Sequence, residues 1–333
     1  MRLLLVELRR LSWRNAVRLL SLAAVVIPLI MLVSLAWSTR PVTDADLKRA
    51  EAEIAAMQAE NADMVAQDLE MCTQHPRDWG IDPDTADVEA ACTEQMVGWA
   101  PTPEEWVGRQ RLEPAQHGMD LGTQAGGLVA MLALLIGATY AGADWQSGSM
   151  SNQLLFEPRR GRVWLAKAGG VLLGALAVAA TSAALLWAGF AGLTAWRDVE
   201  VTGAVWRETL ELVGRTGLLA MLAAVGGYAL TMLLRSTVGT LGVLFVLGLA
   251  GSMIVGLLPL ADAQRWFLPH NVLAVVQDGY RYYDWELPTC SEMDGETGCY
   301  GTVTLGEGVR FLGALLVLTM AMSLPSFLRR DVP

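Results

Sequence analysis

Six stretches of this chain contain no Asp, Glu, Lys or Arg, and each is long enough, or nearly so, to cross a bilayer. They are residues 19–39, 121–143, 168–196, 216–234, 236–261 and 311–328. An α-helix rises about 1.5 Å per residue, so about 30 Å of hydrocarbon requires roughly 20 residues. A soluble helical core would need polar faces on some of these helices, and the six stretches have none. The sequence therefore predicts an all-α membrane protein with six transmembrane helices.

The distribution of basic residues predicts the orientation of these spans. With the N-terminus, residues 144–167, Arg235 and the C-terminal tail on one side, that side holds 12 basic and 4 acidic residues, and the other holds 12 basic and 30 acidic residues. Since basic residues in short loops mark the cytoplasmic face, we expect both termini in the cytoplasm of a cell-membrane protein. The sequence has no basic surface with interleaved aromatic residues, so no nucleic-acid partner is expected.

The segments between the spans complete the predicted organisation. In chain order they are a cytoplasmic interfacial helix (1–18), an extracellular domain (40–120), a cytoplasmic loop (144–167), an extracellular loop (197–215), an extracellular segment (262–310) and a cytoplasmic tail (329–333). In the first of these, three leucines share one helical face and three arginines the opposite face, which is typical of a helix lying in the membrane interface. These residues are Leu4, Leu8 and Leu11, and Arg9, Arg10 and Arg14.

The extracellular domain begins with apolar residues at spacings of three and four, which predicts one long amphipathic helix. The apolar stripe consists of Leu47, Ala50, Ile54, Met57, Met64 and Met71, interrupted by Asn61 and Asp68. Packing of this stripe within its own domain is favoured over a coiled coil with a second copy, because three heptads are marginal for a coiled coil. Five prolines follow between residues 76 and 114 and predict short helices and loops.

All four cysteines fall in segments assigned to the outside. An even number of cysteines on the oxidising side predicts disulfides, and short loops favour Cys72–Cys92 and Cys290–Cys299 over the other pairings. A zinc site is the weaker alternative, because the histidines are not at ligand spacing from any CxxC pair.

The extracellular segment 262–310 contains the uncharged sequence WFLPHNVLAVVQ, residues 266–277, which is too short to cross the membrane. It predicts a re-entrant or interfacial helix. His270 in this helix could act as a proton relay, although a lone histidine near an interface is more often a satisfied polar group.

The sequence lacks the motifs of common catalytic sites. It has no GxxxxGK[ST] phosphate loop and no HExxH motif, so the chain is not expected to be an enzyme or to hold a metal or nucleotide of its own. The charge-free spans also argue against an ion-coupled carrier.

The cytoplasmic loop reads DWQSGSMSNQLLFEPRRGRVWLAK from Asp144 to Lys167. Gly148 and Ser149 are expected to break the preceding helix and to offer a hydroxyl N-cap, and Pro158 to end the next one. The short helix between them would present apolar side chains to the cytoplasm, namely Met150, Leu154, Leu155 and Phe156. A helix of this length is unstable alone, which favours a partner that covers it. The alternative is an ordinary connecting loop flanked by positive-inside arginines.

In this loop and in the order of its elements, the chain resembles the permease subunits of ABC-2-type ABC transporters, the exporters with the type V fold. The matching residues are Gly142, Ala143, Asp144, Gly148, Ser149, Leu154, Leu155, Pro158, Arg159, Arg160 and Lys167, followed by the turn LLRSTVG at residues 233–239 and a short helix before the last span. Asp144 stands where many members of the family carry Glu, and the cysteine-bearing domain is absent from many of them.

The resemblance implies a transport subunit that exports a hydrophobic or amphipathic substrate. It implies a coupling helix for the ATPase, formed by Asp144, Gly148, Ser149, Leu154, Leu155, Phe156, Arg159 and Arg160. The expected partners are two ABC ATPase subunits, which would bind ATP and Mg, a second permease copy or close paralogue, and membrane lipid. The alternative is a membrane-anchored binding or sensing protein, in which the acidic extracellular domain receives a ligand.

Overall fold

A computed structural model describes residues 2–83, 85, 87–97, 101–251, 253–254, 262–284 and 299–329. The chain divides into two compact units. The bundle unit comprises Met1–Val33 and Glu113–Pro333, and the insertion unit comprises Ser34–Leu112. The predicted extracellular domain, 40–120, corresponds approximately to the insertion unit.

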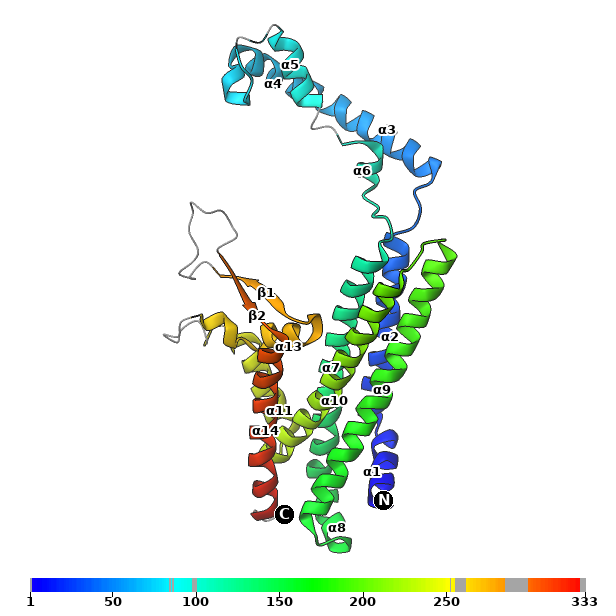
Figure 1. Cartoon of the computed structure of the whole chain (residues 1–333), viewed down its shortest axis with the longest axis vertical. Coiled ribbons are helices and arrows are strands. Elements are labelled where there is room, and N and C mark those ends of the chain that lie inside the picture. The colour runs from blue at the N-terminus through cyan, green and yellow to red at the C-terminus, as the bar shows by residue number, and fades with distance from the viewer. Residues whose placement is uncertain are drawn as a thin grey trace. The chain divides into compact units, whose positions relative to one another are not determined.

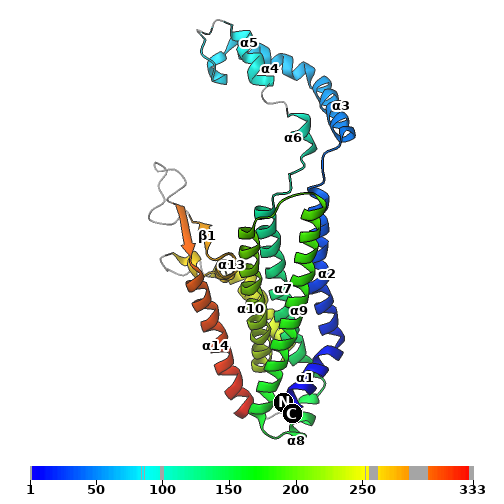
Figure 2. The ribbon, with the colours of Figure 1, turned by 45° about the vertical axis from the view of Figure 1, so that its right-hand side comes forward.

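Among the described residues, five helices are long and apolar enough to cross a membrane, judged by length and composition. They are α2 (Asn15–Ser38), α7 (Pro114–Gln146), α9 (Arg160–Trp196), α10 (Gly203–Leu234) and α14 (Leu305–Arg329). Within the bundle unit, α7, α9 and α10 run side by side, and both chain ends lie at the same end as the short helix α8 (Ser149–Phe156) (Figures 1 and 2). These five helices indicate a multi-pass membrane protein. Most extend beyond the predicted spans, because the charged residues that flank a span do not end a helix.

The backbones of α7 and α10 pack closely against each other. A Cβ atom at Gly137 would lie 1.9 Å from the carbonyl oxygen of Ala224, and one at Gly227 would lie 2.2 Å from the carbonyl oxygen of Leu134. Small residues at such positions let two backbones approach closely. Helices in a bilayer associate through such packing, because lipid tails are as apolar as the helix surfaces and no hydrophobic driving force brings the helices together.

The sequence predicts a sixth span at 236–261, and among the described residues this region contains the shorter apolar helix Thr237–Gly248. It begins as α11 (Thr237–Phe245) and continues as the π-helical turn η2 (Val246–Ala250). Arg235 adopts a left-handed conformation between α10 and α11, and the hydroxyl of Ser236 caps α11 by accepting from the Gly239 N–H at 3.1 Å. Residues 255–261 lie outside the described part of the chain, so the sixth span remains a prediction.

The segment before α14 contains η3 (Ala263–Trp266), the expected short helix as α13 (Leu268–Gln277), and a hairpin of β1 (Tyr280–Tyr283) and β2 (Tyr300–Val303). In the part of the chain that the structure describes, this antiparallel pair, with Tyr280 opposite Val303, is the exception to the all-α prediction. Its aromatic and β-branched residues favour an extended backbone. The main-chain oxygen of Asn271 lies 2.7 Å from where a Cβ at Gly308 would stand, so α13 packs closely on α14.

The insertion unit contains two helices where one long helix was predicted. α3 (Asp44–Glu60) and α4 (Ala62–Gln74) are separated at Asn61, whose backbone leaves the helical region. Ala50 and Ile54 of the apolar stripe are buried in α3, which packs against α6 (Pro103–Val107). Packing within the domain is therefore confirmed for this half of the stripe, whereas Met64 and Met71 are exposed.

Two polar contacts fix the start of α3. Thr43 and Asp46 form a capping box, and Arg109 Nη1 lies 2.7 Å from Asp46 Oδ2. The Arg109 side chain, followed by the Thr43 hydrogen bonds, holds the pKa of the Asp46 carboxyl well below its usual range. The carboxylate therefore stays ionised and keeps both contacts at neutral pH.

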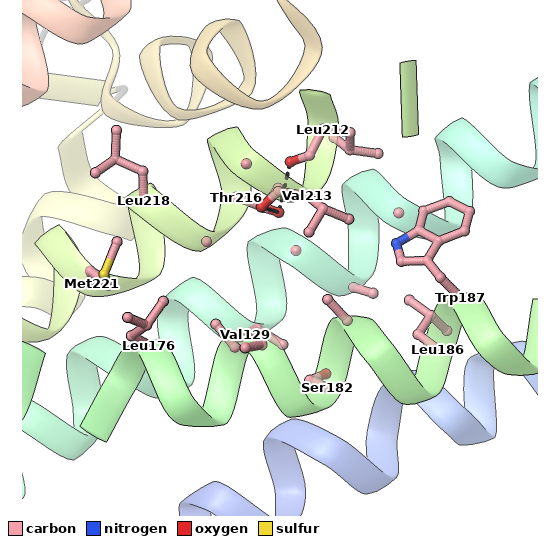
Figure 3. A pocket seen from close by; sticks show the side chains of 18 residues that line it. Val129, Leu176, Ser182, Leu186, Trp187, Leu212, Val213, Thr216, Leu218 and Met221 are labelled. Carbon is pink, nitrogen blue, oxygen red and sulfur yellow. Dashed lines mark hydrogen bonds between the residues drawn. The ribbon is translucent and has the colours of Figure 1, made fainter. Parts of the chain in front are cut away.

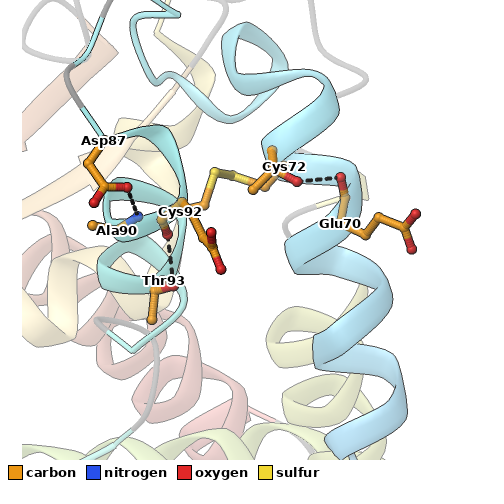
Figure 4. Close-up of a disulfide and its surroundings, with 8 residues drawn as sticks. Glu70, Cys72, Asp87, Ala90, Cys92 and Thr93 are labelled. Atoms are coloured by element: carbon orange, nitrogen blue, oxygen red, sulfur yellow. Dashed lines mark hydrogen bonds between the residues drawn. A yellow bond between two sulfur atoms is a disulfide. The ribbon is translucent and has the colours of Figure 1, made fainter.

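The predicted disulfide Cys72–Cys92 is confirmed and joins α4 to α5 (Val88–Val97) (Figure 4). Asp87 precedes α5 and accepts a hydrogen bond from the Ala90 N–H at 2.9 Å. The short helices expected after Pro76 are also present, as η1 (Pro76–Trp79), α5 and α6. Cys299 is disulfide-bonded as well, and its predicted partner Cys290 lies outside the described residues.

Candidate functional site

The most distinctive polar site of the bundle unit surrounds α8. Gly148 adopts a left-handed conformation (φ 66°), which reverses the chain after α7 and starts α8. Glu157 is extended, as expected before a proline, and Pro158 follows. The predicted short helix is thus present with the expected start and end. The predicted Ser149 cap is wrong: Gly148 occupies the N-cap position, and the Ser149 hydroxyl donates to Asp144 Oδ1 at 2.6 Å.

One face of α8 packs against the bundle. Met150 is 1% exposed, and Leu154 packs, half-buried, against the core cluster that includes Ala141 and Trp164. The sequence predicted that Met150 would be presented to a partner, and this prediction is wrong. Helical spacing alone could not separate the two faces, because four of the eight residues of α8 are apolar.

The other face of α8 carries two exposed apolar side chains. Leu155 is 80% exposed and Phe156 is 91% exposed, and we call this pair the α8 tip. Arg159 is exposed nearby, whereas Arg160 Nη1 donates to the carbonyl oxygen of Phe327 at 3.3 Å and Arg162 Nη1 lies 3.4 Å from Glu157 Oε2. Of the predicted partner-facing groups, the α8 tip and Arg159 are the most accessible.

A buried cluster of charges lies behind α8. Lys167 Nζ lies 2.5 Å from Asp144 Oδ2 and 3.0 Å from Glu7 Oε2, and all three side chains are fully buried. Tyr140 also donates its hydroxyl proton to the Glu7 carboxylate. The cluster joins α1 (Arg2–Trp13), α7 and α9. Buried ions are tolerated only when paired and hydrogen-bonded, so this cluster constrains the relative positions of the three helices.

Two arginines from the N-terminal segment extend this cluster, and one of them, Arg10, reaches α8. Arg14 forms an ion pair with Asp144, and Arg10 Nη1 donates to Gln153 Oε1 at 3.0 Å. Gln153 in turn donates from Nε2 to Glu7 Oε1 at 2.5 Å. Gln153 of α8 is thus hydrogen-bonded to two residues of α1. We name Glu7, Arg10, Arg14, Tyr140, Asp144, Ser149, Gln153 and Lys167 the anchor cluster.

Glycines of α9 let α1 approach this cluster. A Cβ at Gly170 would lie 3.3 Å from the Cβ of Glu7, and a Cβ at Gly174 would lie 2.3 Å from Leu11 Cδ2. Leu11 is buried and Leu4 is half-buried, in agreement with the predicted apolar face of α1. The predicted arginine face is only partly free, because Arg10 and Arg14 bind within the anchor cluster.

Sequence reasoning placed Asp144, Gly148, Ser149 and Lys167 in one motif but missed the contributions of Glu7, Tyr140 and Gln153. A signal for Glu7 exists, since it is the sole acid among five arginines in residues 1–18. Likewise, Lys167 is one of only two lysines in the chain. An isolated charge of this kind beside an apolar span is usually paired.

The ring of His270 contacts other residues of the protein. Its Nδ1 lies 3.0 Å from the carbonyl oxygen of Gln264, and its ring stacks on Tyr282 with ring centres 4.9 Å apart. Burial lowers the pKa of His270, so the ring is neutral at physiological pH. These contacts favour the satisfied polar group over the proton relay.

Among the described residues, no group of three or more His, Cys, Asp or Glu side chains is arranged to hold a metal ion. Neither a family model, nor a curated protein, nor a solved structure matches the chain. The resemblance to ABC-2-type permeases therefore rests on the residues quoted for it, and the function is a proposal argued from the anchor cluster and the α8 tip.

Proposed function

We propose that this chain is the transmembrane permease subunit of an ATP-driven ABC exporter, with α8 as its coupling helix. The observation that carries the proposal is an eight-residue helix that is fixed on one face by the anchor cluster and exposes Leu155 and Phe156 on the other. Exposed large apolar side chains on a rigid support fit a groove in a protein partner.

The location of α8 supports the same assignment. It lies at the end of the bundle unit where both chain ends lie (Figure 2), and the positive-inside distribution of arginines favours a cytoplasmic location for this end. ATP and Mg would be held there by two separate ATPase subunits. A second copy of the chain, or a close paralogue, would complete the translocation pathway in the cell membrane.

The anchor cluster gives α8 a means of transmitting force. A movement of α8 imposed by the ATPase would act on α1 through Gln153, and on α7 and α9 through Asp144 and Lys167. Because buried ion pairs lose several kcal/mol when a partner is removed, these helices would tend to move together rather than separate.

The apolar character of the spans suits a hydrophobic or amphipathic export substrate. The hydroxyls of Ser182 and Thr231, which lie in the spans, are bonded within the protein. Ser182 donates to the carbonyl oxygen of Ala24 at 2.7 Å, and Thr231 donates to Thr240 Oγ1 at 2.9 Å. Neither hydroxyl is therefore offered to a polar substrate in this conformation.

The proposal is tested by measuring which ATPases co-purify with the chain when the α8 tip is altered. The chain and its Leu155→Asp and Phe156→Asp variants are purified from membranes, and associated P-loop ATPases are identified and quantified by mass spectrometry. A charge inserted into an apolar groove costs several kcal/mol unless it is paired, so both variants should lose the ATPase. Both positions are exposed, so the folding of the chain should not change.

Asn152→Asp is the matched control, because Asn152 is an exposed residue of the same helix outside the α8 tip. It should retain the ATPase. Normal docking and activity of both tip variants would instead identify α8 as a connecting element and favour the membrane-anchored sensor.

A further inference from the structure

An apolar pocket of about 190 Å³ lies between α7, α9 and α10. For scale, an engineered apolar cavity of about 150 Å³ stays dry and binds benzene. Its α7 residues, Gly122 to Val129, end 17 residues before Gln146, which is roughly 25 Å along the axis. The pocket is therefore remote from α8, although its Leu176 is only nine residues along α9 from Lys167 of the anchor cluster, and docking of an ATPase at α8 does not explain it.

The pocket is elongated along the helices. Trp187 lies at one end of it, and Leu176 and Met221 lie at the other (Figure 3). Leu176 and Trp187 are 11 residues apart on α9, which is about 16 Å along the axis and close to half of a bilayer hydrocarbon core of about 30 Å. A linear ligand fits this shape better than a compact one.

The lining of the pocket suits hydrocarbon along most of its length. Its two side-chain hydroxyls are both bonded to main-chain oxygens, Ser182 to Ala24 and Thr216 to Leu212 at 2.8 Å. The remaining lining residues are aliphatic, glycine, Met221 or Trp187. Apart from the indole N–H of Trp187 at one end, the described lining residues offer no free side-chain donor, so a polar group placed deeper in the pocket would lose its hydration, which costs several kcal/mol per group.

The position of the pocket relative to the nearest charges indicates where a polar head group would lie. Asp120 comes two residues before the first pocket residue of α7, and Arg215 lies among the first pocket residues of α10. These charges mark the polar boundary at the Trp187 end. Leu176 and Leu218, which are 41% and 53% exposed, lie on the surface that a bilayer would cover.

We propose that this pocket binds one acyl chain of a membrane phospholipid of the leaflet remote from α8. The head group lies at the level of Asp120 and Arg215, the chain enters past Trp187, and its methyl end reaches Leu176 and Met221. The bound chain fills space that would otherwise lack van der Waals contacts in the bundle. This site requires the membrane-spanning bundle but not the export function.

Photolabelling in a bilayer tests the site. The full chain is placed in nanodiscs that contain a phospholipid with a diazirine on one acyl chain, irradiated, digested and mapped by mass spectrometry. With the diazirine near the ester, labels should concentrate at residues 186–187 and 212–213. With the diazirine at the chain end, they should move to residues 176 and 221. Both sets should exceed, severalfold, the labelling of Val317 and Leu318, which are exposed on α14.

Two adjacent alanines provide a matched pair of variants. Ala183 lines the pocket, whereas Ala184 is exposed beside it and does not. Ala183→Phe should fill the pocket and reduce its labelling severalfold, while Ala184→Phe should leave the labelling at the wild-type level. If Ala183→Phe fails to fold, the comparison of the two diazirine positions on the wild-type chain still tests whether the pocket binds an acyl chain.

Three results would overturn the proposal. The first is labelling of α14 equal to that of the pocket, and the second is a pattern that does not move with the diazirine position. The third is a cross-link between cysteines placed at Leu218 of two copies, which would show that a second protein chain covers the opening.

Discussion

Lys167 Nζ lies 2.5 Å from Asp144 Oδ2 in a bundle whose other contacts are largely apolar, and both side chains are fully buried. The two residues are at opposite ends of the loop that contains α8. Their pairing therefore closes the base of this loop, and Glu7 binds the same ammonium group from α1 at 3.0 Å.

Removal of Lys167 should destabilise the bundle. Lys167→Met leaves two buried carboxylates, Glu7 and Asp144, without their shared cation, and breaking a buried ion pair in this way costs about 3–5 kcal/mol. We expect a large loss of thermal stability in the detergent-purified chain. The control is Lys48→Met, because Lys48 is the other lysine of the chain and is exposed. Equal stability of the two variants would mean that the anchor cluster is not formed in solution.

Asp144→Asn should loosen α8 with a smaller effect on the spans. Asparagine keeps the shape of the side chain and can still accept from Ser149, but it loses the charge that holds Arg14 and Lys167. Hydrogen exchange should therefore accelerate in residues 149–156 more than in α7 or α9, because local opening becomes less costly there. In the assembled complex, ATP hydrolysis should continue while transport falls.

Asp120→Asn is the control for this experiment, since Asp120 is exposed on the same helix. If α8 exchanges at the wild-type rate in Asp144→Asn, the helix is held mainly by Met150 and Leu154, and the ionic contacts contribute little to its position.

Five of the six predicted spans, as helices of spanning length, and the Cys72–Cys92 disulfide could be predicted from sequence for simple reasons. A stretch of some 20 uncharged apolar residues has few alternatives to a spanning helix, and Cys72 and Cys92 are separated by only 20 residues. The break at Asn61 was not predicted, because Asn61 interrupts the apolar stripe but the stripe resumes at Met64 in the same helical register. Local propensity decides such a break, and the pattern alone does not record it.

The anchor cluster could be predicted only in part. Glu7 contacts Lys167 across 160 residues and Gln153 across 146 residues. No periodicity connects partners at such separations. The burial of Met150 and the exposure of Phe156 likewise depend on which side of α8 meets the bundle, which is decided by the turn at Gly148 and the tertiary contacts beyond it.

Loss of the Cys72–Cys92 disulfide should destabilise the insertion unit. In the chain-entropy model a loop of about 20 residues corresponds to roughly 3 kcal/mol, gained by restricting the unfolded chain. Cys72→Ala should therefore increase hydrogen exchange and proteolysis in α4 and α5, while α7 and α10 keep their protection. Non-reducing peptide mapping of the wild-type chain should recover the Cys72–Cys92 link together with the predicted Cys290–Cys299 link. Free thiols at Cys72 and Cys92 would contradict both the pairing and the extracellular location.

A methyl group at Gly137 should disrupt the contact between α7 and α10. The added Cβ would lie 1.9 Å from the carbonyl oxygen of Ala224, a backbone atom that cannot move without shifting α10. We expect Gly137→Ala to lower the yield and thermal stability of the folded chain, because the helices must separate and lose the close packing that holds them.

Gly127→Ala is the matched control on the same helix, since a Cβ there meets nothing within 4 Å. Alanine has the higher helix propensity by roughly 1 kcal/mol, so Gly127→Ala should be neutral or slightly stabilising. If Gly137→Ala destabilises the chain and Gly127→Ala does not, the close approach of the α7 and α10 backbones contributes to stability. If the two variants are equally stable, α7 and α10 are further apart than in this structure.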